Sequence, residues 1–151
     1  MSDHVRRQIR EAFVALVTGL PTTGPRVHSG RVRPLGSGHE PCLLVYATDE
    51  SAERATIGRN PLLARTLLVA VEGRVSVASA QAAEDLLDTI AAEIEARVAG
   101  SSPRLGGLAS DLVLAATRIL VTAEGHRHDG EIRLLFRVSY RTRAEAPTVA
   151  E

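Results

Sequence analysis

Apolar residues recur along the chain with two different periods, and each period predicts a different kind of element. Between positions 3 and 20, apolar side chains return every three or four residues, a spacing that gathers them on one face of a helix. They are Val5, Ile9, Ala12, Phe13, Leu16, Val17 and Leu20. Ser2 or Asp3 is the predicted N-cap, while Gly19 and Pro21 are expected to end the helix.

A second helix is predicted over residues 79–99 by the same spacing. Ser79 is the candidate N-cap, and Gly100 suits the left-handed residue that follows many helices. The apolar face consists of Ala82, Ala83, Leu86, Leu87, Ile90, Ala91, Ile94 and Val98.

Four longer segments predict strands. Residues 41–47 and 62–73 are runs of apolar and β-branched residues bounded by Pro41 and Gly73. Residues 111–122 are apolar on both faces for much of their length, which predicts a central strand. Residues 130–143 alternate between apolar and polar types, as in an antiparallel strand with one buried and one solvated face.

These elements together predict an α+β fold of one domain over residues 1–143. A short strand fragment is expected at residues 31–33. Since each helix has one apolar stripe, both helices are expected on one face of a mainly antiparallel sheet of about four strands. The polar segment from about residue 49 to 61 should then form a protruding β-hairpin arm. Residues 144–151 lack periodicity and are expected to be a disordered tail.

Composition excludes several functional classes. The 151 residues carry 18 basic and 18 acidic side chains, lysine does not occur, and the formal net charge is +0, so long-range capture of nucleic acid is not indicated. Cys42 is the single cysteine and is expected to be a buried thiol, because one cysteine cannot form an internal disulfide. No apolar run is long enough for a membrane span, and the first residues lack a signal-peptide pattern. We therefore expect action in the cytoplasm, or in a particle assembled there.

No catalytic constellation is evident, so neither an enzymatic activity nor a cofactor is expected. Gly36-Ser37-Gly38 lacks the following lysine and helix of a phosphate loop. His126 and His128, with Asp129 beside them, could bind zinc or a catalytic metal. The sequence does not place a third ligand such as His28 or His39 near them, so a polar hairpin turn is the preferred interpretation.

Three charged surfaces are candidate interfaces, and for the basic face of the first helix and the acidic face of the second an ordinary solvated surface is the preferred interpretation. The arm could pair with a neighbouring subunit by adding a strand or by matching charges, and we favour that interpretation because loops of this length in compact domains are usually functional or disordered. The candidate residues are Glu50, Glu53, Arg54 and Arg59 in the arm, Arg6, Arg7 and Arg10 in the first helix, and Glu84, Asp88 and Glu95 in the second.

From Val5 to about Thr142, the sequence resembles the tail terminator (minor tail) proteins of long-tailed bacteriophages and related prophage particles. No single motif is a chemical signature, and the resemblance lies in the order and spacing of several segments. These are residues 16–24 with Arg26-Val27, 43–46 with 49–53, 65–67 with 71–73, 85–98, 105–108 and 134–140.

This resemblance implies a structural role in the virion and no catalytic residues. Family members form hexameric rings on the head-proximal end of the tail tube, stop its growth and present a surface to the head connector. The implied partners are copies of the same chain, the tube protein and the connector or neck protein, with DNA passing through the lumen without specific recognition and no membrane contact. The segment from Glu50 to Arg59 resembles the protruding hairpin of the family.

We also hypothesise that the basic first helix and the acidic second helix meet across subunits. Two other functions stay open on the sequence alone. One is another neck component, for head closure or tail completion, because such proteins are also small α+β ring formers. The other is a small metal-dependent enzyme that uses His126 and His128.

Overall fold

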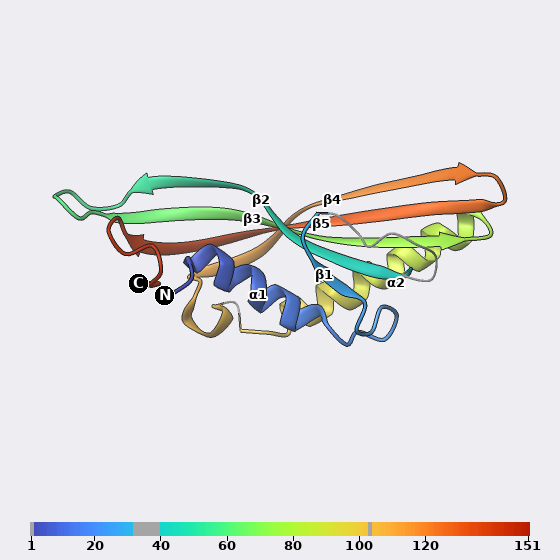
Figure 1. Ribbon diagram of the computed structural model, residues 1–151, viewed down its shortest axis with the longest axis horizontal. Coiled ribbons are helices and arrows are strands. Elements are labelled where there is room, and N and C mark those ends of the chain that lie inside the picture. Colours follow the sequence, from blue (N-terminus) through green and yellow to red (C-terminus); the bar gives the residue numbers. More distant parts are fainter. Residues whose placement is uncertain (1, 32–39, 103) are drawn as a thin grey trace.

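Two helices cover one face of a five-stranded sheet (Figure 1). The computed structural model describes residues 2–31, 40–102 and 104–151. The helices are α1 (Val5–Val17) and α2 (Ala80–Ala99), with a short 3-10 turn η1 (Leu105–Gly107). The strands are β1 (Val27–Ser29), β2 (Cys42–Arg54), β3 (Leu62–Val77), β4 (Asp111–Glu124) and β5 (Arg127–Arg143), in the order β1-β2-β3-β5-β4.

The sheet is long and mostly antiparallel. Every residue of β3 has a partner in β5, whereas β1 pairs with β2 in parallel over only Val27–Ser29. Figure 1 shows the β2–β3 hairpin at one end of the molecule and the β4–β5 hairpin at the other, with both helices beneath the same face. The predicted α+β class is confirmed, and the fifth strand is β1. The expected fragment at residues 31–33, the Gly36-Ser37-Gly38 loop and His39 lie wholly or partly outside the described residues.

The core lies between the helices and the sheet. Phe13 of α1 meets Phe136 of β5 with ring centroids 5.5 Å apart. On α2, Ile90 lies so close to β3 that a Cβ on Gly73 would be 3.0 Å from its Cγ2 atom. The helix residues that are buried are Val5, Ile9, Phe13 and Val17 of α1 and Ala83, Leu87, Ile90, Ala91, Ile94 and Val98 of α2. Burial of this apolar surface, at about 25 cal/mol per Å², holds the layers together.

A β-bulge in β2 changes which side chains face the helices. Up to Ala47, odd-numbered residues of β2 lie opposite the helix-facing positions of β3, as in the pair Val45–Val71. The register shifts between Ala47 and Asp49, so Glu50 lies opposite the buried Leu67. Because side chains alternate with a period of two, the extra residue turns the even-numbered positions of the distal strand toward the helices.

The prediction that residues 111–122 form a central strand is wrong, because β4 is the edge strand. A register shift between Leu114 and Ala116 explains the misleading pattern. Leu112 and Leu114 face the same side as Phe136 and Val138 before the shift, whereas Thr117 and later odd-numbered residues do so after it. The segment thus combines two alternating patterns of opposite phase, which together look apolar on both faces.

Helix ends partly follow the predictions. Ser79 caps α2, as expected, since its side chain accepts a hydrogen bond from the amide of Ala82. Gly100, however, has φ −78° and ψ −11°, which is right-handed backbone rather than the predicted left-handed residue. The first helix begins later than expected and is capped by His4, not by Ser2 or Asp3, because the His4 side chain accepts from the amide of Arg6.

Residues 144–151, for which the sequence predicts disorder, form turns against the rest of the chain. The Pro147 carbonyl accepts a hydrogen bond from the Val5 amide at 3.0 Å, and the Glu151 amide donates to the Arg141 carbonyl at 2.9 Å. Backbone hydrogen bonds of this kind carry no signal in side-chain periodicity. They bring both chain ends to the base of the β2–β3 hairpin (Figure 1).

Candidate functional site

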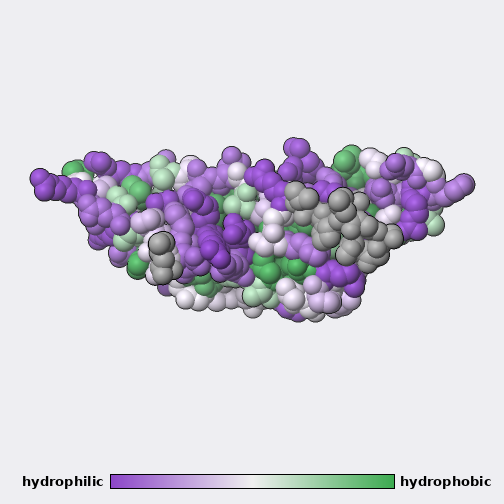
Figure 2. All heavy atoms as spheres, in the orientation of Figure 1, coloured by the Kyte–Doolittle hydropathy of each residue, from purple (hydrophilic) through white to green (hydrophobic). Residues whose placement is uncertain are grey.

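The most prominent feature of the surface is the distal part of the β2–β3 hairpin, residues 49–61, which we call the arm. All residues from 51 to 60 are exposed, and Ile57 near its tip is 94% exposed. The end of the molecule that carries the arm is mostly hydrophilic (Figure 2). We therefore take the arm as a candidate contact surface, and its almost fully exposed isoleucine as a candidate contact residue.

The tip of the arm has a defined conformation. The Ala55 amide donates to the Leu62 carbonyl at 2.7 Å, and the Leu62 amide donates to the Thr56 hydroxyl, also at 2.7 Å. Gly58 has φ +121°, a backbone conformation that other residues rarely adopt. On the other side, the Asn60 side-chain oxygen accepts from the Glu145 amide at 2.9 Å. The arm is thus presented by local hydrogen bonds and by the C-terminal residues.

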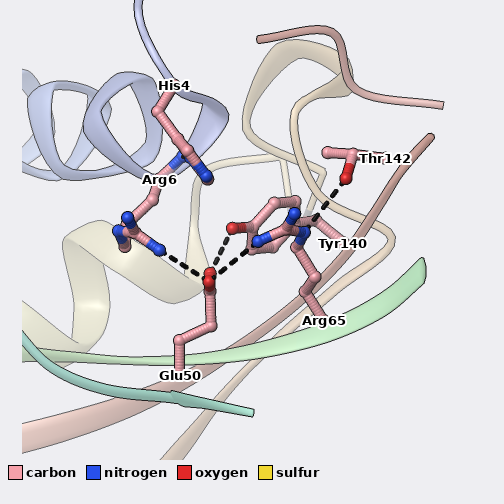
Figure 3. Close-up of polar contacts among 6 residues, drawn as sticks. All are labelled: His4, Arg6, Glu50, Arg65, Tyr140 and Thr142. Carbon is pink, nitrogen blue, oxygen red and sulfur yellow. Dashed lines mark hydrogen bonds and ion pairs between the residues drawn. The ribbon is translucent and has the colours of Figure 1, made fainter. Parts of the chain in front are cut away.

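Glu50 anchors the base of the arm to α1 and β5 (Figure 3). Its Oε2 atom lies 2.6 Å from Arg6 Nη1 and 3.1 Å from Arg65 Nη1, and its Oε1 atom accepts a hydrogen bond from the Tyr140 hydroxyl. The side chains of Glu50 and Arg65 are each 12% exposed, whereas that of Arg6 is 41% exposed. One carboxylate therefore joins a helix and three strands around it.

The neighbours of Glu50 complete a closed polar network. Arg65 donates through Nε to the Thr142 hydroxyl at 3.0 Å, and its guanidinium lies 5.9 Å from the centroid of the Tyr140 ring. Burial raises the pKa of Tyr140 well above its usual value, with the hydrogen bond to Glu50 and the negative charge of Glu50 adding to the effect. The Tyr140 phenol is thus held neutral as a donor, and the network positions the arm rather than presenting a reactive group.

His4 connects this network to the start of α1. Its Nδ1 atom accepts from the Arg6 amide at 3.0 Å, which satisfies one of the free N–H groups of the first turn. Burial lowers the pKa of His4, and the positive charges of Arg6 and Arg65 lower it further, while Glu50 raises it by a smaller amount. The histidine is therefore favoured in its neutral form, in which Nδ1 can accept.

Two of the three arginines predicted as an interface on α1 form ion pairs within the chain. Arg6 binds Glu50, and Arg7 binds both Asp3 and Glu11 at 3.0 Å. Arg10 is partly buried, and its Nε atom has no hydrogen-bond partner among the described residues. Arg6 in particular is already engaged, which leaves little free positive charge on this helix for the acidic helix of another subunit.

The acidic candidates on α2 all point to solvent. Glu84, Asp88 and Glu95 are exposed, and none forms an ion pair with another described residue. Glu93, by contrast, accepts hydrogen bonds from the amide and the hydroxyl of Thr22 at 2.9 and 2.5 Å. The outer face of α2 therefore carries free negative charge.

The remaining arm candidates are Glu53, Arg54 and Arg59, which are exposed and have no ion pair within the described part of the chain. They differ from Glu50, although the sequence grouped them with it. After the bulge, Glu50 and Arg54 share the helix side of the sheet, and Glu53 lies on the other. The structure thus separates an anchored base from an unpaired tip.

His126 and His128 lie at the tight β4–β5 turn. Glu124 pairs with Arg127, which leaves Gly125 and His126 as the two turn residues, and Gly125 has φ +61°. His128 is partly buried and pairs with Val77 and Ala123, while His28 lies on β1 at the opposite edge of the sheet. Within residues 2–31, 40–102 and 104–151, no three His, Cys, Asp or Glu side chains are grouped as metal ligands.

A second polar cluster, which the sequence analysis missed, lies on the face of the sheet away from the helices. Glu72 is 5% exposed, accepts from the Tyr46 hydroxyl at 3.0 Å and forms an ion pair with Arg74 at 2.8 Å. It lies beside a small apolar group of Leu44, Tyr46 and Ala70. Its two-residue spacing from Arg74 on one strand is the sequence signal that could have indicated it.

An apolar hollow of about 370 Å³ lies between the C-terminal part of α2 and the start of β4. One carboxylate, that of Glu95, lines the hollow, and most of the other lining side chains are apolar. They include Val98, Ala99, Leu112, Leu114 and Phe136. Since several polar groups do not converge there, the hollow suits an apolar side chain better than a polar small molecule.

No family profile matches the chain, and no curated protein matches it. One solved structure to which it is similar is a chain of the "Virion of native gene transfer agent (GTA) particle", with 14% sequence identity, a TM-score of 0.38 and coverage of 92% of each chain. A likeness of this size does not establish a shared fold. Neither described helix is both long and apolar enough to cross a membrane.

Replacing Glu50 by Ala should lower the free energy of unfolding by about 2–3 kcal/mol, because the partly buried Arg65 loses its counter-charge. The matched control is Glu53→Ala, which removes an exposed carboxylate from the same strand and should change stability by less than about 0.5 kcal/mol. Urea unfolding of the two variants measures the difference. Equal losses in both would contradict the anchoring role of Glu50.

The His4 cap should make stability depend on pH. Because the folded-state pKa of His4 is lowered from 6.5, the unfolded chain takes up the proton first, so stability is full above pH 6.5 and falls as the pH decreases below it. His4→Asn keeps a capping side chain without a titrating ring. Comparing the unfolding midpoints of both proteins between pH 7.5 and pH 5 isolates this effect, since all other histidines are shared. A constant difference across this range would contradict it.

Proposed function

We propose that the chain is a structural component of a phage-like virion, and that it caps the head-proximal end of the tail tube as a ring of identical subunits. In this role it ends polymerisation of the tube and provides the surface for joining to the head connector. The ring is hexameric by resemblance to the tail terminator family, and DNA passes through its lumen without specific recognition. The chain does no chemistry of its own.

The proposal is supported most by the structure of the arm. It is exposed along residues 51–60, yet its base is fixed to α1 and β5 through Glu50. A projection that is fixed at its base and free at its tip suits a permanent contact with a neighbouring subunit, because little order must be gained on binding. Its position in the chain agrees with that of the protruding hairpin in the family that the sequence resembles.

The sheet edges also favour assembly. The outer edge of β4 is unpaired within the described chain over Asp111–Glu124, and Val113, Ile119 and Leu120 on it are 45%, 52% and 51% exposed. Long edge strands with exposed apolar side chains tend to pair with other chains unless they are protected. Assembly into a ring is one way to cover them.

The proposal is tested by electron microscopy of particles produced without this chain. Tail tubes of uncontrolled, excessive length are expected, because nothing then stops addition of tube subunits. Tails of normal length that fail to join heads would assign the chain to head closure or tail completion instead. Intact, infectious particles would contradict any structural role in the tail. Expression of the chain in trans is the control and should restore normal tails.

A further inference from the structure

We propose that the arm tip of one copy inserts Ile57 into the apolar hollow between α2 and β4 of the next copy. The inference refines the ring of the proposed function by naming the contact between subunits. It rests on three features of the described residues: an exposed apolar side chain, a hollow that can receive it, and opposite charges beside the side chain and the hollow.

Ile57 is the anchor. At 94% exposure it is the most exposed of the large hydrophobic side chains, and residues 51–60 around it are also exposed. A single exposed apolar residue is common on protein surfaces and needs no partner. Ile57 differs because it lies at the tip of a projection whose turn is fixed by hydrogen bonds, a position in which it cannot fold back onto its own core.

The hollow is the receptor. Its volume of about 370 Å³, its aliphatic lining and the ring of Phe136 at its wall would desolvate an inserted aliphatic side chain. The high exposure of Ile57 shows that the chain's own arm does not occupy the hollow. The occupant we propose is the arm of a second copy, because its exposed isoleucine matches the apolar lining.

Charge agrees with this pairing. The arm tip carries Arg54 and Arg59 against one carboxylate, Glu53, and Glu95 lines the hollow on the acidic outer face of α2. None of these four side chains forms an ion pair among the described residues. Opposite charges around an apolar anchor favour the correct orientation of the two copies. The free arginines of the arm, rather than those of α1, thus meet the acidic helix.

The contact joins two different surfaces, and this has a geometric consequence. Each copy offers one arm and one hollow, so copies bind head to tail, and repetition of such a contact closes into a ring or continues as a filament. An isologous dimer, in which the same surface meets itself, would stop at two copies. The two arrangements can therefore be told apart by mixing defective variants.

The experiment uses sedimentation velocity of the purified full chain over a range of concentrations. Ile57→Asp places a charge on the anchor, and Ala99→Trp fills the hollow at an exposed helix position. Each change is expected to weaken self-association by at least about 30-fold, because central apolar anchors dominate interfaces. Val149→Asp is the control, since it charges a side chain that is 55% exposed and lies outside both surfaces, and it should assemble like the unchanged chain.

Mixing the two defective variants gives the decisive result. Ile57→Asp retains its hollow and Ala99→Trp retains its arm, so an equimolar mixture should form heterodimers and nothing larger, while each variant alone stays monomeric. Circular dichroism checks that both variants are folded. Self-association that survives Ile57→Asp, a mixture without heterodimers, or an unchanged chain that stays monomeric at all concentrations would overturn the inference. The sedimentation experiments test only the contact between copies. The proposed function is tested separately, by tail length in particles that lack the chain.

Discussion

The continuous pairing of β3 with β5 is the constraint on which the rest of the structure depends. Each residue from Leu62 to Val77 has a partner in β5, so the two strands form a single stiff ribbon along the molecule. One end of this ribbon supports the arm and the other supports the β4–β5 turn (Figure 1). The helices do not cover the distal part of the β2–β3 hairpin, and this end of the sheet therefore extends beyond the core as a projection.

Two β-bulges, in the strands β2 and β4 that flank this ribbon, change which side chains face the helices. The bulge in β2 turns Glu50 toward the helices, where Arg6, Arg65 and Tyr140 surround it. Without the extra residue, the same carboxylate would face the opposite side and the arm would lose its connection to α1. The bulge in β4 likewise changes the side on which its apolar residues lie, which leaves part of them exposed at an open edge.

The sequence predicted the elements well, because helix and strand periods are local properties. The alternation of β5 and most of both apolar stripes are found as expected, although Ala82, predicted on the apolar face of α2, is exposed. The order of the strands in the sheet was harder to predict. Apolar residues on both sides of β4 suggested a central strand, because periodicity shows that a position is apolar but not which element covers it. The register shift in β4 also makes an edge strand look apolar on both faces. The Glu50 network was missed for the same reason: it depends on a bulge and on residues far apart in the chain.

The central claim is that the arm is an assembly element held ready by the fold. The most direct test is amide hydrogen exchange of residues 56–60 in the free chain and in the assembled state. The account predicts rapid exchange of these tip amides in the free chain, strong protection after assembly, and unchanged protection in the β3–β5 ribbon, which is already paired. Equal exchange of the arm in both states would contradict the account.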